Sequence, residues 1–79
     1  MPKAYSKGYR LLLKHIRDRR MELQLSQDQV AARVGKSLLW VQRVEAGKYR
    51  MDFLQTVDLL RVLHIDLEDA AKLIQGGTR

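Results

Sequence analysis

The stretch from Leu25 to Gly47, LSQDQVAARVGKSLLWVQRVEAG, decides the fold because its cap residues and apolar spacing predict two short helices joined by a turn. Ser26 followed three residues later by Gln29 is a capping box, in which each residue's side chain accepts the other's backbone N–H. We therefore expect the first helix to begin at about Gln27. Gly35 should end it, because glycine adopts a left-handed backbone without a Cβ penalty.

The second helix of the pair is predicted to begin at Leu38, with Ser37 as its N-cap, and to stop at Gly47. Leu38, Val41 and Val44 follow one another on an apolar stripe at helical spacing. Two helices of about two turns each, with so short a link, must cross steeply.

Helical spacing of apolar residues predicts one further helix before the pair and two after it. The first helix runs from a Ser6 cap to about Leu23. The fourth helix, capped by Asp52, runs from Phe53 to Leu63. Its apolar residues are expected to form the second wall of the core: Phe53, Leu54, Val57, Leu60 and Leu63.

A break near His64 separates the fourth helix from a short last helix, Leu67 to Ile74. Asp66 is its predicted cap. Gly76 and Gly77 are expected to end it.

The length and composition limit the chain to one small, cysteine-free domain. We expect an all-α fold of five helices over residues 9–74, between a flexible basic arm at residues 1–8 and a flexible tail at residues 75–79. No stretch approaches the roughly 20 apolar residues of a membrane span. These features favour a cytoplasmic protein.

The net charge of +6 is unevenly distributed. Residues 1–50 hold 12 Lys/Arg and 4 Asp/Glu, a net charge of +8, whereas residues 51–79 carry a net charge of −2. A basic surface attracts polyanions, and phosphate contacts make such binding strongly salt dependent. A solvated charged face is the plainer interpretation, but the helix pair in the same half favours nucleic-acid binding.

No group of residues indicates catalysis, a metal site or a cofactor. His15 and His64 are predicted in separate segments, the first exposed and the second at a helix end, without carboxylates at ligand spacing. The acidic run of Asp66, Glu68 and Asp69 lacks the central glycine of a calcium loop. We therefore expect no catalytic residue, no metal and no small-molecule ligand.

From Leu12 to Ile74 the chain resembles the phage repressor and Cro-like (XRE-type) helix-turn-helix regulators. The resemblance rests on an ordered set of residues: Arg20, Leu25-Ser26-Gln27, Val30-Ala31, Val34-Gly35, Val41, Glu45-x-Gly47, Arg50 and Leu63-x-Ile65-x-Leu67. Short stand-alone members of the family often carry an aromatic residue at the position of Trp40 and an Arg-aliphatic-Asp sequence like Arg50-Met51-Asp52. The family implies a five-helix, repressor-like bundle that binds duplex DNA, commonly as a dimer, in a bacterial or phage-encoded regulator of transcription.

The resemblance implies that the helix from Leu38 to Glu45 enters the major groove. Its outward side chains are expected to contact bases: Leu38, Leu39, Gln42 and Arg43. Arginine can bind guanine O6 and N7 together, and glutamine can bind adenine N6 and N7. Family members commonly carry polar groups at the first two positions, whereas Leu38 and Leu39 offer only apolar contacts, such as those to thymine methyl groups.

Phosphate contact is implied for Gln27, which matches the family's glutamine at the start of the first helix of the pair. Basic and polar residues around the pair are expected to add to it: Arg17, Lys36, Lys48, Tyr49 and Arg50, with Arg10 and Lys14 on the same flank. The resemblance also pairs Arg20 with Glu45. We interpret this ion pair as structural, because a buried pair that loses one partner leaves a stranded charge.

Two other functions fit the sequence. Leu38 and Leu39, with Trp40 beside them, would also form an apolar patch for a protein partner, such as a toxin or a larger regulator. The basic charge alone would support non-specific DNA binding. A single tryptophan at helical spacing is itself more typical of core or rim packing than of base stacking.

A homodimer is expected to form through the last two helices. Their charge is not needed on DNA, and Leu67, Leu73 and Ile74 exceed what a core of this size must absorb.

Overall fold

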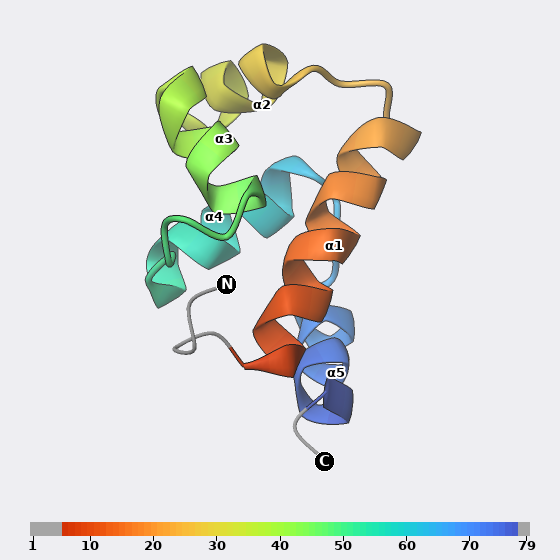
Figure 1. The fold of residues 1–79 in the computed structure, drawn as a ribbon. Coiled ribbons are helices and arrows are strands. Elements are labelled where there is room, and N and C mark those ends of the chain that lie inside the picture. The colour runs from red at the N-terminus through yellow and green to blue at the C-terminus, as the bar shows by residue number, and fades with distance from the viewer. Residues whose placement is uncertain (1–5, 78–79) are drawn as a thin grey trace.

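The computed structural model describes residues 6–77 and places five helices within them (Figure 1). They are α1 (Lys7–Glu22), α2 (Gln27–Val34), α3 (Leu38–Glu45), α4 (Phe53–Val62) and α5 (Leu67–Gly77). No strand occurs in this described part of the chain. The all-α, five-helix fold predicted from the sequence is thereby confirmed.

Side-chain caps begin the helices where the sequence predicted them. The Ser26 hydroxyl accepts the Gln29 N–H at 3.0 Å, and the Gln29 side chain accepts the Ser26 N–H at 2.8 Å. Ser6 and Ser37 cap α1 and α3, and Asp52 forms a second capping box at α4. Because each cap satisfies an amide that the helix itself cannot, the starting points are fixed by local sequence.

Four helix ends share one closing geometry. The residues with positive φ that follow α1 to α4 are Gln24 (57°), Gly35 (74°), Gly47 (73°) and His64 (55°). In each case the next residue's N–H donates to the carbonyl oxygen five positions earlier, as in a Schellman motif. Gly35 and the break near His64 confirm the predicted helix ends, whereas the turn at Gln24 had not been predicted.

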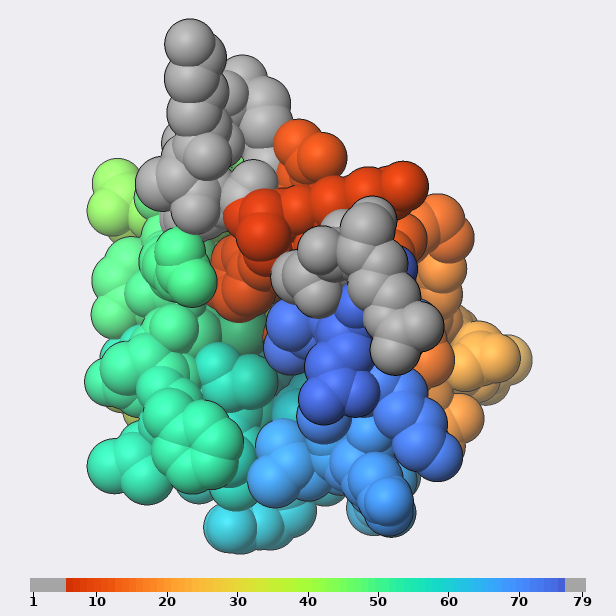
Figure 2. Space-filling model, turned by 90° about the horizontal axis from the view of Figure 1, so that it is seen from below, coloured from red at the N-terminus to blue at the C-terminus, as the bar shows by residue number. Residues whose placement is uncertain are grey.

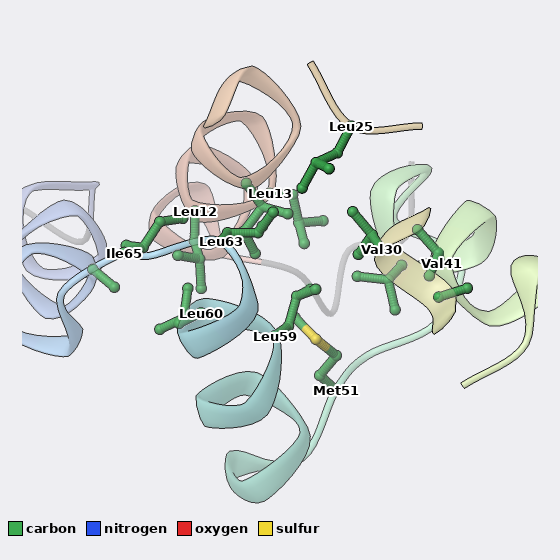
Figure 3. Packing of buried hydrophobic residues seen from close by; sticks show 14 of the residues in the cluster. Leu12, Leu13, Leu25, Val30, Val41, Met51, Leu59, Leu60, Leu63 and Ile65 are labelled. Atoms are coloured by element: carbon green, nitrogen blue, oxygen red, sulfur yellow. The ribbon is translucent and has the colours of Figure 1, made fainter. Parts of the chain in front are cut away.

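One apolar core joins all five helices, and α5 contributes Ala70 to it. Figure 3 shows this cluster from close by. Met51, in the connection before α4, reaches into it toward Leu59. No polar or charged residue is buried as a whole among the residues that the structure describes. The most deeply buried side chains are Leu12, Ile16, Val30, Val41, Val44, Leu59, Leu60 and Leu63.

The apolar wall predicted for α4 was partly wrong. Phe53 is 68% exposed and Leu54 is 72% exposed, while Leu59, which had not been predicted, is buried. The start of α4 diverges from α1 and α5 (Figure 1), and Phe53 borders an open groove whose other side is lined by residues of those two helices. The remaining predicted positions are buried or half-buried: Val57, Leu60 and Leu63.

The chain ends also differ from the predicted boundaries. Lys7 and Gly8, assigned to the arm, belong to α1, and α5 continues past Ile74 to Gly77. Ser6, also assigned to the arm, caps α1, while residues 1–5 of the expected arm and 78–79 of the expected tail lie outside the described residues. The predicted Asp66 cap is present, since its carboxylate accepts the Glu68 N–H at 2.7 Å.

The close crossing of α1 and α5 depends on Gly8. A Cβ placed on Gly8 would overlap the carbonyl oxygen of Ile74 and lie 2.9 Å from its Cα. Both obstructing atoms belong to the backbone and cannot rotate away. Only glycine therefore allows the two helices to approach this closely.

Gly8→Ala should lower the free energy of unfolding by about 1–3 kcal/mol, because the helices must separate to admit the methyl group. Urea unfolding measures the effect. Gly76→Ala is the matched control: no atom lies within 4 Å of a Cβ there, and alanine favours a helix over glycine by up to about 1 kcal/mol. Equal unfolding midpoints for the two variants would contradict the close crossing.

Candidate nucleic-acid interface

The helix pair α2 and α3 lies at one end of the molecule, with α3 in contact with α1 (Figure 1). Val30 and Ala31 of α2 and Val41 and Val44 of α3 are buried in the core. These contacts fix the rotation of α3 about its own axis. The opposite face of α3 is consequently turned to solvent.

That outer face carries the four residues expected to contact bases. Leu38 is 36% exposed and Leu39 is 52% exposed, and Gln42 and Arg43 are also exposed. Neither the Gln42 nor the Arg43 side chain has a hydrogen bond or ion pair with another residue of the described range 6–77. Their polar groups are therefore available to a ligand.

An ion pair ties α3 to α1. The Arg20 guanidinium donates to Glu45 through Nε at 2.7 Å and Nη2 at 3.0 Å, in a bidentate contact. Its Nη1 donates to the Leu25 carbonyl oxygen at 2.9 Å. The two side chains are only 14% and 6% exposed, so the pair that the resemblance implied is present and largely withdrawn from water.

Gln27 belongs to the same network. Its Nε2 donates to Glu45 Oε1 at 3.1 Å, and the residue is half-buried at the start of α2. Sequence reasoning had given Gln27 a phosphate contact and missed this bond, for which no local signal exists across 18 positions of the chain. The neighbouring Asp28 adds a negative charge to the first turn of α2.

Basic residues continue along the connection that follows α3. Lys48 and Arg50 are exposed, and the Lys48 N–H donates to the Arg43 carbonyl oxygen at 2.8 Å. The Arg50 guanidinium lies 5.4 Å from the centroid of the Tyr9 ring, within the range of a cation–π contact. Tyr9 also accepts the Met51 N–H through its hydroxyl at 3.2 Å. A residue of α1 thus holds the connection in place, a role that the sequence did not reveal.

Trp40 packs at the rim of the core, as expected. It is half-buried, and its ring lies 6.1 Å from that of Tyr49 and 5.8 Å from Lys36 Nζ. Its indole N–H is buried without a hydrogen-bond partner in the described residues. Tyr49 in turn donates its hydroxyl to Gln55 at 3.1 Å, so this tyrosine supports the connection rather than standing free.

The two histidines lie far from each other in the chain and in different environments. His15 is half-buried, not exposed as predicted, and His64 is exposed at the end of α4. Residues 6–77 contain no group of three His, Cys, Asp or Glu side chains able to hold a metal ion. None of the helices described is long and apolar enough to cross a membrane.

Comparison with protein families matches residues 11–73 to a helix-turn-helix domain. Among solved structures, the chain is similar to the clp gene regulator ClgR from C. glutamicum, with a TM-score of 0.76. The alignment covers 98% of this chain and 100% of that one at 17% sequence identity, so it bears on the fold. Comparison with curated proteins finds no significant match.

Glu45→Ala should lower the free energy of unfolding by about 3–5 kcal/mol, because it strands the Arg20 guanidinium in a largely buried site. Urea unfolding is the measurement. Asp18→Ala, which removes the exposed ion pair with Lys14, should have a far smaller effect. Similar losses in the two variants would show that the Arg20–Glu45 pair has no special structural role.

Proposed function

Since the chain belongs to the helix-turn-helix domain family, we propose that it is a sequence-specific, duplex-DNA-binding repressor of transcription, working in the cytoplasm and encoded by a bacterium or phage. Membership of this family agrees with the expectation that the chain is not an enzyme. One observation carries the proposal: the exposed face of α3 presents unbonded Gln42 and Arg43 side chains beside a basic connection.

In this proposal α3 enters the major groove, whose width of about 12 Å admits one helix. Arg43 reads guanine and Gln42 reads adenine, each bidentate contact discriminating by roughly 1–3 kcal/mol. Leu38 and Leu39 make apolar contacts with the methyl groups of thymine bases. Direct readout is therefore divided between two hydrogen-bonding and two apolar side chains.

Phosphate contacts position the protein in this arrangement. The exposed cations Lys48 and Arg50 supply them from the connection after α3. Gln27 does so from the start of α2, where its bond to Glu45 fixes its orientation. The other residues proposed to lie along the backbone are Arg17, Lys36 and Tyr49.

The exposure of Leu38 and Leu39 also favours a second function. Two adjacent leucines on an outward face, at 36% and 52% exposure, fit a protein partner as well as thymine methyl groups. Such a contact would depend little on salt, whereas phosphate neutralisation makes DNA binding fall steeply as salt rises. Binding by charge alone would be salt dependent but indifferent to sequence.

We further propose a homodimer through α4 and α5, which lie on either side of one face of the molecule (Figure 2). Of the residues first expected there, Leu67 is 48% exposed, while Leu73 and Ile74 are half-buried. Phe53 and Leu54 add a larger exposed apolar area. Phe53 and Leu67 border an apolar groove of about 280 Å³.

Selection from a random duplex DNA pool at moderate salt should enrich a half-site or palindromic motif with the wild-type protein. Gln42→Ala/Arg43→Ala should abolish the enrichment while leaving the unfolding midpoint unchanged, because both side chains are exposed. Arg61→Ala, which removes an exposed cation on α4, is the control and should retain the motif.

Two results would count against this proposal. If the folded wild type enriches no motif and its binding partner is a protein, the Leu38 and Leu39 surface is a protein interface. If the double variant weakens binding to matched and scrambled sequences equally, the protein binds by charge alone.

Phe53→Ser/Leu54→Ser should abolish cooperative binding to two half-sites placed about one helical turn apart, while binding to a single half-site is retained. Titration of both duplexes, with sedimentation of the free protein, measures this. Leu11→Ser, at an exposed position of α1, serves as the control. Unchanged cooperativity in the double variant would place the dimer contact elsewhere.

A further inference from the structure

The apolar groove between α4 and α5 has the make-up of a small-molecule site. Its volume is about 280 Å³, and no residue of α3 lines it. The buried side chains of Leu12 and Leu60 form its floor, and Figure 3 shows them close together in the core. Ala70 and Ala71 of α5 contribute only methyl groups to the wall, so the space beside them stays open. The lining comes from α1, α4, α5 and the connection before α4, and the sequence therefore predicted no ligand here.

The charge on this groove comes from Arg50. It is the one charged residue among the described residues that line the groove, and no carboxylate lies on the walls. Its guanidinium lies 5.4 Å from the centroid of the Tyr9 ring, which lines the groove as well. The Tyr9 hydroxyl accepts the Met51 N–H at 3.2 Å, so the chain directly after Arg50 is tied to α1. A positive charge is thereby held at the edge of an apolar surface.

The other polar groups near the groove are engaged within α4 and its cap. The Thr56 hydroxyl, on the wall, donates to the Asp52 carbonyl oxygen at 2.8 Å. The Asp52 carboxylate does not line the groove and accepts the Gln55 N–H at 2.8 Å. A ligand in the groove therefore meets one cationic donor and otherwise mainly apolar surface.

These features define the ligand as an apolar body with one anionic end. An apolar cavity of about 150 Å³ holds a benzene molecule, so the volume of this groove corresponds to roughly 10–12 non-hydrogen atoms. The planar carboxylate accepts two parallel N–H bonds from a guanidinium. A phosphate ester would bring a second negative charge that no other cation on the walls offsets. A monocarboxylate with a chain of about eight to ten carbons meets both requirements.

We propose that the groove binds an aliphatic monocarboxylate, its chain against Leu12, Leu60 and Ala71 and its carboxylate on Arg50, and that this ligand weakens DNA binding. The site stands on the groove itself, whereas its effect on DNA rests on the function proposed above, in which Arg50 contacts a phosphate. A carboxylate on Arg50 neutralises the charge that the phosphate requires, so the two anions compete for one guanidinium. By linkage, DNA must lower the affinity for the carboxylate by the same factor.

Titration of the free protein with octanoate, followed by NMR chemical shifts below the micelle-forming concentration, tests the site. Octanoate should bind, while 1-octanol and octylamine, which carry the same chain without the anion, should bind at least several-fold more weakly. Butanoate should bind far more weakly than octanoate, because each fully buried methylene raises affinity about fourfold. Arg50→Gln should remove most of the preference for octanoate over 1-octanol.

Ala71→Phe places a ring in the groove and should abolish octanoate binding. Because Ala71 is exposed, the unfolding midpoint should stay near that of the wild type. Gly76→Phe is the matched control: it adds the same ring to α5, outside the groove lining, where no atom lies within 4 Å of a Cβ. This control should bind octanoate as the wild type does.

A duplex with a single half-site tests the effect on DNA without dimerisation. Saturating octanoate should weaken wild-type binding several-fold and lower the slope of log K against log salt by roughly 1, the loss of one phosphate contact. Ala71→Phe should bind this duplex with wild-type affinity and should not respond to octanoate.

Equal affinities for octanoate and 1-octanol, or equal losses in Ala71→Phe and Gly76→Phe, would overturn the carboxylate site. Failure of the folded wild type to bind octanoate would overturn it too, and a self-association that Ala71→Phe abolishes would then identify a second copy as the occupant. Octanoate that binds without changing DNA affinity would overturn the competition at Arg50. If the wild type binds octanoate but no DNA, the proposed function fails while the ligand site stands.

Discussion

The bidentate contact between Arg20 and Glu45 is the interaction on which the placement of α3 depends. Helices as short as α2 and α3, with eight residues each, are not stable alone in water. Glu45 stands at the C-terminal end of α3, where the helix dipole disfavours a carboxylate. The Arg20 guanidinium offsets that cost, and the bond from Gln27 to the same carboxylate brings the start of α2 into the arrangement.

Around this contact, local hydrogen bonds set the ends of the helices, and tertiary packing sets their arrangement. Caps and Schellman closures determine where α1 to α4 begin and end, and the apolar core determines how they lie against one another. The close crossing at Gly8 then fixes α5 along α1. The connection after α3 is held from two sides, by Tyr9 of α1 and by Gln55 of α4.

The sequence predicted the helices well because capping chemistry acts over three or four residues, as at Ser26 and Asp52. It also predicted the outer face of α3, since Val41 and Val44 identify the inner one. Periodicity failed at Phe53 because it shows which residues share a face, not how far the opposing helix extends. The bonds made by Gln27 and Tyr9 join residues distant in the chain, and no local pattern encodes them.

The two faces of α3 make separate contacts, and this separation bears on how the sequence of such a protein can change in evolution. Val41, Val44 and Glu45 hold the helix, while Gln42 and Arg43 touch neither the core nor the ion pair. Substitutions on the outer face can therefore accumulate without endangering the fold. Under the DNA binding proposed above, a duplicated gene could acquire a preference for a different DNA sequence while its product remains folded, so a scaffold of this kind is open to divergence and to redesign.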